Sequence, residues 1–298
     1  MDAQTILKSA FSTFGDLAPD TMAALAERFF THPRRIPAPP RERPWVDEAT
    51  RAVVDTPVGP VATLTWSNAL FPWEDATQTS PRGTVLLVHG WEGRGSQLCA
   101  FVEPLLARGF KVIAFDGPAH GASPGVVADA LVFSLALRAV AAADANVRAV
   151  IAHSMGGGAA TVAVADGLDV DAVVLLAPPL SADTVTDDFA DSLGLTASTK
   201  QALKERLSRR FHAYAWNRLS FDLAAGARRG DVPCLIVHDK DDVEIPFARG
   251  SALHARWPGA VFKETAGLGH RKILREPAVV ADVVSFVDGA VPPTVRDD

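Results

Sequence analysis

The sequence predicts an α/β fold with a mostly parallel central sheet and helices on both of its faces. The main observation is that, from Thr84 onward, short runs of Val, Ile and Leu alternate with longer helical stretches. Such continuous apolar runs are typical of strands buried on both faces, and the helices between them supply the crossovers that parallel strands need. The second observation is size, since 298 residues of which 48% are hydrophobic are enough to bury a sizeable core.

The first 45 residues predict an N-terminal helical extension that ends in a Pro-rich linker. Apolar side chains recur at helical spacing over residues 3–31, and the pattern breaks at GDLAPD, residues 15–20. The linker HPRRIPAPPRERP at residues 32–44 contains five prolines, which cannot continue a helix. Residues 46–298 are expected to form the main domain, which begins with a β-hairpin at residues 50–66 around the turn Pro57–Pro60.

Six further runs predict the remaining strands of the sheet. They are TVLLVH (84–89), KVIAFD (111–116), VRAVIAH (147–153), DAVVLLA (171–177), PCLIVH (233–238) and the weaker AVFKET (260–265). The interval between the fourth and fifth runs is about fifty residues long, too long for an ordinary connection in this architecture. It contains a predicted helix, STKQALKERLSRRFH (198–212), and several aromatic residues. We expect a small helical lid at about residues 180–230, with an elaborated surface helix pair as the alternative.

Composition and charge exclude several classes of function. A net charge of −6 disfavours a nucleic-acid partner, because binding to phosphates requires a clustered basic surface. The sequence has no run of 18 apolar residues, so no membrane span is predicted. The first residues lack the basic start and the apolar stretch of a secretory signal, so a cytoplasmic location is expected. Because metal-ligand spacings and phosphate-binding glycine motifs do not occur, neither a metal nor a cofactor is expected. Cys99 and Cys234 are expected to be buried free thiols.

The segment VIAHSMGGGAA, residues 150–160, places Ser154 between a predicted strand and a predicted helix. A serine hydroxyl needs an adjacent base to become a nucleophile. A sharp turn from strand to helix would hold the hydroxyl clear of the backbone, and the small residues Ala152 and Gly156 would let such a turn close. The alternative is that Ser154 is simply the N-cap of the following helix.

Two glycine-containing loops follow the first two strands after the hairpin. LLVHGWEGRG (86–95) opens a loop whose backbone N–H at Trp91, together with that of Met155, would hold a substrate oxyanion. FDGPAHGAS (115–123) is a Pro/Gly turn, and we expect structural roles in it for Asp116 and His120.

Two later motifs contain the acid and the histidine that a serine nucleophile requires. LIVHDKDDVEIP (235–246) ends a strand in a cluster of acids, and AGLGHRKI (266–273) places His270 in a loop before the last helix. Serine, acid and histidine, each just after a strand, follow one another in the chain order of one particular architecture.

Together these five motifs resemble those of the α/β-hydrolase fold family, and the resemblance spans about residues 50–289. The matching pieces are HGWEG (89–93), DGPAHGAS (116–123), AHSMGG (152–157), HDKDDVEIP (238–246) and GLGH (267–270). The resemblance implies an α/β-hydrolase fold with Ser154 as the nucleophile, His270 as the general base and Asp242 as the orienting acid. It also implies an oxyanion hole made by the backbone amides of Trp91 and Met155. The sequence departs from the family pattern at Asp239, where glycine is usual, and by the extra acid Asp241, so the carboxylate that faces His270 is left open.

These assignments predict a serine hydrolase that cleaves a small to medium-sized carboxylic ester, or a related acyl compound, through a Ser-His-Asp triad and an acyl-enzyme. Family members that open epoxides or displace halide use an aspartate at the position of Ser154 and are therefore disfavoured. A thioesterase, an amidase or a carbon–carbon bond hydrolase would use the same triad, and a non-catalytic ligand-binding protein of this fold is the other alternative. The expected partner is a small-molecule acyl substrate.

The aromatic residues of the expected lid are candidates for the substrate pocket. Ligands of open α/β sheets bind beyond the carboxyl ends of the strands, usually against apolar walls. We therefore predict that some of Phe211, Tyr214, Trp216 and Phe221 line an acyl pocket above Ser154. The alternative is that they fill the lid's own small core. The N-terminal extension is expected either to pack over the lid or to form a homodimer contact.

Overall fold

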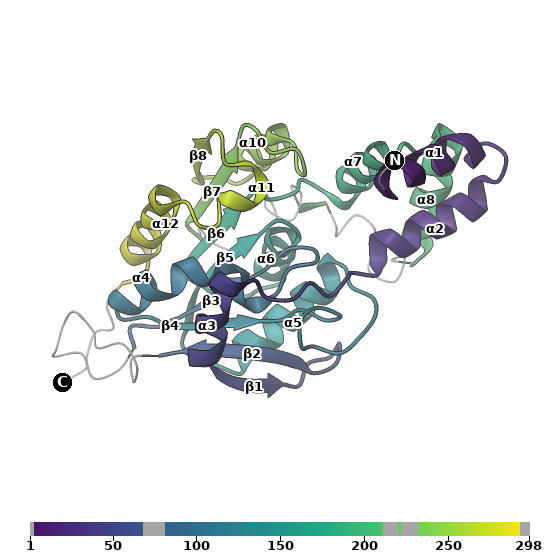
Figure 1. Ribbon diagram of the computed structural model, residues 1–298. Coiled ribbons are helices and arrows are strands. Elements are labelled where there is room, and N and C mark those ends of the chain that lie inside the picture. The colour runs from purple at the N-terminus through teal and green to yellow at the C-terminus, as the bar shows by residue number, and fades with distance from the viewer. Residues whose placement is uncertain (1–2, 68–80, 211–219, 222–231, 293–298) are drawn as a thin grey trace, which may run out of the picture.

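The computed structural model, which describes residues 3–67, 81–210, 220–221 and 232–292, is built around an eight-stranded sheet (Figure 1). The strands are β1 (Thr50–Val54), β2 (Val61–Trp66), β3 (Thr84–Val88), β4 (Lys111–Phe115), β5 (Val147–His153), β6 (Ala172–Leu176), β7 (Cys234–Asp239) and β8 (Val261–Thr265). They lie in the order β1-β2-β4-β3-β5-β6-β7-β8. β2 is antiparallel to both of its neighbours, and every pair from β4 to β8 is parallel. The predicted hairpin, the six predicted strands and the mostly parallel sheet are confirmed.

Helices cover both faces of this sheet. The N-terminal elements are α1 (Ala3–Phe14), α2 (Pro19–Thr31), the 3-10 turn η1 (Pro40–Glu42) and α3 (Arg43–Glu48). The later elements are η2 (Gly95–Phe101), α4 (Val102–Ala107), α5 (Ala130–Ala142), α6 (Met155–Ala165), α7 (Ala182–Leu193), α8 (Ala197–Arg210), α10 (Phe247–Arg256), α11 (Gly269–Lys272) and α12 (Pro277–Ala290). One face of the sheet packs against α5, α6 and α10, and the other packs against η2, α4 and α12 (Figure 1).

Alternation of side chains along the strands divides the apolar core into two layers. In β3, Leu86 and Val88 belong to the layer under α5 and α6, whereas Val85 and Leu87 belong to the layer under α4 and α12. All four side chains are fully buried, which explains why the strand is apolar at every position. Because β3, β4, β5, β7 and β8 run parallel, the loops that follow them leave the sheet at one edge. The motifs identified in the sequence occupy these loops.

The N-terminal extension packs against the described part of the expected lid. α1 lies against α7 and α2 lies against α8, so that the four helices form a cluster beside the sheet (Figure 1). Phe30 of α2 packs edge-on against Phe189 of α7, with ring centroids 5.1 Å apart. Glu27 of α2 accepts hydrogen bonds from Arg206 and Arg210 of α8 at 2.7 and 3.3 Å. The N-terminal extension therefore packs on α7 and α8.

The structure also bears on the expectations for a membrane span and for the two cysteines. Within the described residues, no helix is both long enough and apolar enough to cross a lipid bilayer. Cys99 and Cys234 are buried and are not joined by a disulfide, as expected.

Candidate active site

Ser154 occupies a sharp turn between the end of β5 and the start of α6. Its backbone has φ +53° and ψ −125°, a conformation that non-glycine residues rarely adopt and that costs roughly 1–3 kcal/mol. Gly156 lets the first turn of α6 lie against the end of β3, because a Cβ atom there would clash with the carbonyl oxygen of His89. On the other side of the serine, Ala152 is fully buried in the strand. Close packing therefore explains why the residues on either side of Ser154 are small.

The side chain of Ser154 does not cap the helix that follows it. Ser154 stands at the N-cap position of α6, but its hydroxyl accepts no hydrogen bond from the first-turn amides. Elsewhere in the chain Ser181 does cap α7, accepting from the amide of Thr184 at 3.1 Å. The interpretation of Ser154 as a simple N-cap is therefore wrong, and its hydroxyl is left for another role.

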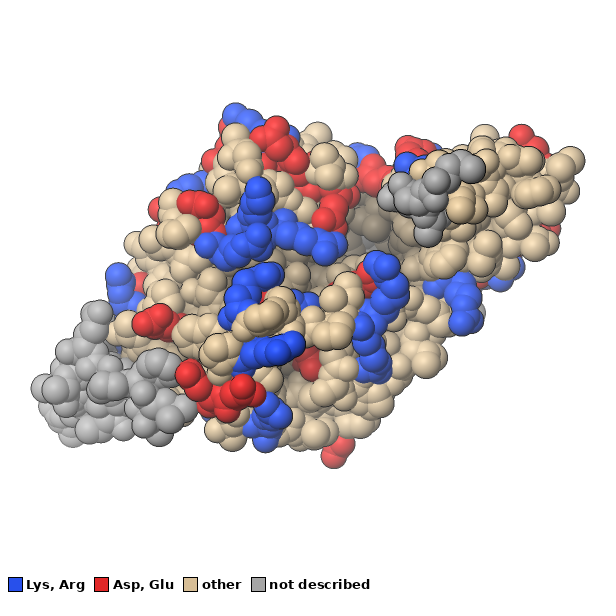
Figure 2. Space-filling model, in the orientation of Figure 1, with Lys and Arg blue, Asp and Glu red and all other residues tan. Residues whose placement is uncertain are grey.

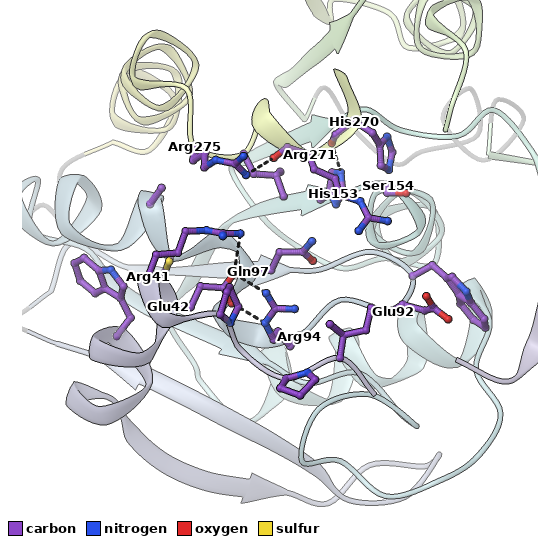
Figure 3. Close-up of a pocket in the computed structure, with 18 of the residues that line it drawn as sticks. Arg41, Glu42, Glu92, Arg94, Gln97, His153, Ser154, His270, Arg271 and Arg275 are labelled. Carbon is purple, nitrogen blue, oxygen red and sulfur yellow. Dashed lines mark hydrogen bonds and ion pairs between the residues drawn. The ribbon is translucent and has the colours of Figure 1, made fainter. Parts of the chain in front are cut away.

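His270 and Asp242 meet from two loops at the carboxyl edge of the sheet. Nδ1 of His270 lies 2.7 Å from Oδ2 of Asp242, and both side chains are buried. The other carboxylate oxygen, Oδ1, accepts the backbone amides of Glu244 and Ile245 at 2.9 Å each. One oxygen therefore fixes the loop and the other fixes the imidazole, which leaves Nε2 of His270 for the cavity that this ring shares with Ser154 (Figure 3).

The carboxyl group of Asp242 is ionised in this arrangement. Burial acts to raise its pKa, but the hydrogen bonds from His238 and His270 outweigh burial and hold the pKa well below its usual range. A carboxylate that stays charged keeps the hydrogen of His270 on Nδ1 and stabilises the ring when it becomes an imidazolium.

The structure decides which of the three clustered acids faces His270. Asp239 is fully buried and holds the loops together, accepting the Thr265 hydroxyl at 2.7 Å and three backbone amides. Asp241 accepts the amide of Gly267 at 2.7 Å. Asp242 therefore stands where the family resemblance implied it, and Asp239, where the family has glycine, ties the loop after β7 to the loop that contains His270.

His153, the last residue of β5, positions the backbone of His270. Its Nε2 lies 3.0 Å from the carbonyl oxygen of His270, and the two rings lie 4.6 Å apart. Since a carbonyl only accepts, the ring hydrogen of His153 is on Nε2. Burial and the neighbouring His270 lower the pKa of His153 well below its ordinary value, so that the ring stays neutral.

Two more neutral histidines cross-link the loop after β3 to the loop after β4. Nε2 of His89 accepts the amide of Gly117 at 2.9 Å, and Nε2 of His120 accepts the amide of Glu92 at 3.0 Å. The hydrogen of each ring is therefore on Nδ1, which donates to a carbonyl of its own loop. Burial lowers the pKa of His89 to about 4 and that of His120 to about 3. His120 has the structural role expected of it, and so has Asp116, which accepts two backbone amides of these loops.

The loop after β3 lies directly against Ser154. A Cβ atom on Gly90 would lie 2.8 Å from Cβ of Ser154, so glycine is required where the two segments meet. Among the described residues, neither the amide of Trp91 nor that of Met155 has a hydrogen-bond partner. Met155 is the first residue of α6, where the amides lack intrahelical acceptors. Both amides are therefore available to an anion that forms beside the serine.

Ser154 and His270 line a cavity of about 580 Å³ at the carboxyl edge of the sheet (Figure 3). The loop after β3 contributes Trp91, and the segment around α11 contributes Arg271 and Leu274. The opposite wall is formed by the Pro-rich linker and the elements that follow it, and its lining residues are Ile36, Pro37, Pro39, Arg41, Glu42 and Trp45.

Residues 85–283 match the model of the alpha/beta hydrolase family. The chain belongs to this family.

Solved structures of other hydrolases have the same fold. The esterase Pf2001 of Pyrococcus furiosus has a TM-score of 0.64 at 17% identity, over 87% of this chain and 100% of its own. DcsB in complex with its substrate analogue has a TM-score of 0.60 at 16% identity, over 82% of this chain and 99% of its own. The 2,6-dihydroxy-pseudo-oxynicotine hydrolase has a TM-score of 0.59 at 16% identity, over 82% of this chain and 68% of its own. No curated protein sequence is significantly similar to this chain.

In this alpha/beta hydrolase, the described part of the expected lid does not wall the cavity. Neither α7 nor α8 contributes a lining residue. Phe221, predicted to line an acyl pocket, is only 2% exposed and packs on α6, where a Cβ atom on Gly158 would lie 2.7 Å from its ring. The aromatic ring fills the space left by a glycine in the helix, so Phe221 belongs to the apolar core and is not among the residues that line this cavity. The other three predicted lining residues, Phe211, Tyr214 and Trp216, lie outside the described residues.

The Pro-rich linker supplies the wall that the lid was expected to supply. Arg34 donates to both carboxylate oxygens of Glu92 at 2.8 and 2.6 Å, and Arg35 donates to the carbonyls of Gly121 and Gly125. These bonds fasten the linker to the loops after β3 and β4. Sequence reasoning missed this role, because two arginines among prolines are equally typical of a solvated linker.

Proposed function

We propose that this alpha/beta hydrolase is a serine hydrolase that cleaves a carboxylic ester of small to medium size. The observation that carries the proposal is the state of Ser154, which is strained, 7% exposed and unused as a helix cap. It shares a cavity with His270, whose ring is bonded to an ionised aspartate. Backbone strain of this kind persists only where the surrounding structure enforces it, and it is concentrated at functional sites. Fold-level likeness to an esterase is consistent with the choice of an ester.

The first half of the reaction forms an acyl-enzyme. The hydroxyl oxygen of Ser154 attacks the ester carbonyl carbon while Nε2 of His270 takes its proton. Asp242 stabilises the resulting imidazolium through its bond to Nδ1. The amides of Trp91 and Met155 hold the negative oxygen of the tetrahedral intermediate. The intermediate then collapses and breaks the bond to the ester's alkoxy oxygen, which takes the proton from His270 and leaves as the alcohol.

The second half of the reaction regenerates the serine. Water enters the cavity and gives a proton to Nε2 of His270 as its oxygen attacks the acyl-enzyme carbonyl. The same two amides stabilise the second tetrahedral intermediate. Its collapse releases the carboxylic acid, and His270 returns the proton to the oxygen of Ser154.

Turnover of a short 4-nitrophenyl ester by wild-type protein and by Ser154→Ala tests the proposal. The variant should fold normally and lose turnover by several orders of magnitude, because no other group replaces the attacking oxygen. Ser134→Ala is the matched control, since Ser134 is a buried serine of α5 whose hydroxyl has no partner among the described residues. Wild-type protein without ester turnover, or a folded Ser154→Ala variant with undiminished turnover, would contradict the proposal.

A further inference from the structure

The cavity that contains Ser154 has a local charge opposite to that of the whole chain. The chain has a net charge of −6, yet among the described residues four arginines and three glutamates line the cavity. They are Arg41, Arg94, Arg271 and Arg275, and Glu42, Glu92 and Glu244. Figure 2 shows Lys and Arg side chains gathered in a band across the middle of the face drawn there.

Each of the three glutamates is already paired with an arginine. Arg94 donates to both oxygens of Glu42 at 2.7 and 2.6 Å, and both of these side chains are largely buried. Arg271 donates to both oxygens of Glu244 at 2.9 and 3.0 Å. The third glutamate is the one bound by Arg34 of the linker, a residue that does not itself line the cavity. The three glutamates are thus neutralised by Arg94, Arg271 and Arg34, and two arginines of the cavity remain.

Those two are Arg41 and Arg275, which come from opposite walls. Arg41 belongs to η1 and lies 3.6 Å from Glu42, whose oxygens are already taken by closer donors. Arg275 follows α11, and its hydrogen bond among the described residues goes to the backbone carbonyl of Arg271 at 3.3 Å. Figure 3 shows both side chains in the cavity that contains Ser154. Within the described part of the chain, neither guanidinium has a carboxylate that is bound to it alone.

We infer that the acyl substrate has an anionic group, a carboxylate or a phosphate, that binds between Arg41 and Arg275 while its ester carbonyl lies at Ser154. A guanidinium group matches the planar oxygens of both anions and forms charge-assisted hydrogen bonds with them. The remaining lining includes Trp45 and Leu274, which provide apolar contacts for the carbon chain. This inference rests on the proposed function, because it names the substrate class for that site. It also explains why the linker, which lies outside the matched family region, is fastened over the cavity.

Two esters that differ in one group test the carboxylate form of the inference. The 4-nitrophenyl monoester of succinic acid is 4-nitrophenyl butyrate with a carboxylate in place of the terminal methyl group. Wild-type protein should have a kcat/KM for the succinate ester at least tenfold above that for the butyrate ester, and the ratio should fall as salt is added. R41Q and R275Q should each reduce this ratio, mainly through a higher KM for the succinate ester, and the double variant should bring it close to one.

Two thioesters test the phosphate form in the same way. Butyryl-coenzyme A has phosphates, whereas the butyryl thioester of N-acetylcysteamine presents the same reacting group without them. A preference for butyryl-coenzyme A that is lost in R41Q/R275Q would assign the arginines to phosphate. A preference confined to the succinate ester would assign them to carboxylate.

R256Q is the matched control for charge, because Arg256 at the end of α10 does not line the cavity. It should leave both ratios unchanged. The inference is overturned if wild-type protein prefers neither anionic substrate, or if the double variant keeps the wild-type preference. These outcomes differ from failure of the proposed function, in which none of the four compounds is hydrolysed.

Discussion

The two walls of the cavity are built by different means. The catalytic wall is made of loops at the carboxyl ends of parallel strands, and its reactive groups are buried and held by short hydrogen bonds. The linker wall is made of prolines and exposed arginines that are fastened by ion pairs, such as that of Arg34, whose side chain is 80% exposed. The matched family region begins at residue 85 and therefore includes only the first wall. The wall that contains Ser154 and His270 is thus held by buried hydrogen bonds, whereas the linker wall is held at the surface.

The largest expected effect separates Asp242 from its acidic neighbours. Asp242→Asn removes the charge that holds and stabilises the His270 imidazolium, so kcat should fall by about 10³ to 10⁴. Asp241→Asn is the control, since an amide oxygen can still accept the one bond from Gly267. The measurement is kcat on a short 4-nitrophenyl ester. Comparable losses in the two variants would mean that Asp242 is not the orienting acid.

The next largest effect is the pH dependence of stability, which follows from three neutral histidines of the catalytic wall. In His89, His120 and His153 the folded-state pKa lies below the ordinary value of 6.5. On acidification the unfolded chain therefore takes up protons that the folded protein does not. The contribution of these histidines to the free energy of unfolding is fully present above pH 7 and is lost as the pH drops below 6.5. Each histidine should contribute about 1.4 kcal/mol between pH 7.5 and 5.5, or about 4 kcal/mol together.

Urea unfolding at several pH values measures this dependence. The variant His120→Gln removes one of the three groups, so between pH 7.5 and 5.5 its free energy of unfolding should fall by about 1.4 kcal/mol less than that of wild-type protein, whatever its stability at pH 7.5. A slope equal to that of wild-type protein would contradict the assignment of this histidine as a buried neutral group.

A smaller effect concerns Asp239, which holds the loop of His270 without touching its ring. Each carboxylate oxygen of Asp239 accepts two hydrogen bonds. Asp239→Asn replaces one of these oxygens with an NH₂ group, which cannot accept, so two donors would lose their partner. The free energy of unfolding should fall by about 1–3 kcal/mol. Unfolding in urea measures the change, and stability equal to that of wild-type protein would show that these bonds do not restrain the loop.

The smallest expected effect lies in the linker wall. A double-mutant cycle with Arg34→Gln and Glu92→Gln should give a coupling energy below about 1 kcal/mol, because exposed ion pairs contribute little to stability. The measurement is urea unfolding of the two single variants and the double variant. A coupling energy of several kcal/mol would remove the contrast drawn between the two walls.

The catalytic wall could be predicted from the sequence because its features have local causes. Strand runs buried on both faces, the small residues around Ser154 and the short motifs that contain Asp242 and His270 are each visible within a few residues, and the order of these motifs along the chain connects them. The linker wall could not be predicted from the sequence. The ion pair of Arg34 with Glu92 joins segments that are 58 positions apart, and no periodic pattern in the sequence indicates it. The surroundings of Phe221 could not be predicted for a related reason: the sequence around an aromatic residue is the same whether its ring lines a cavity or fills the space beside a glycine such as Gly158.

The central claim, that Ser154 is the nucleophile of a hydrolase, is tested most directly by labelling with a fluorophosphonate. This reagent reacts with a serine only when an adjacent base activates its hydroxyl. Intact-mass and peptide analysis should find one phosphonyl group, attached to Ser154, and none on Ser154→Ala. Labelling at another residue, or no labelling of the folded wild-type protein, would contradict the account.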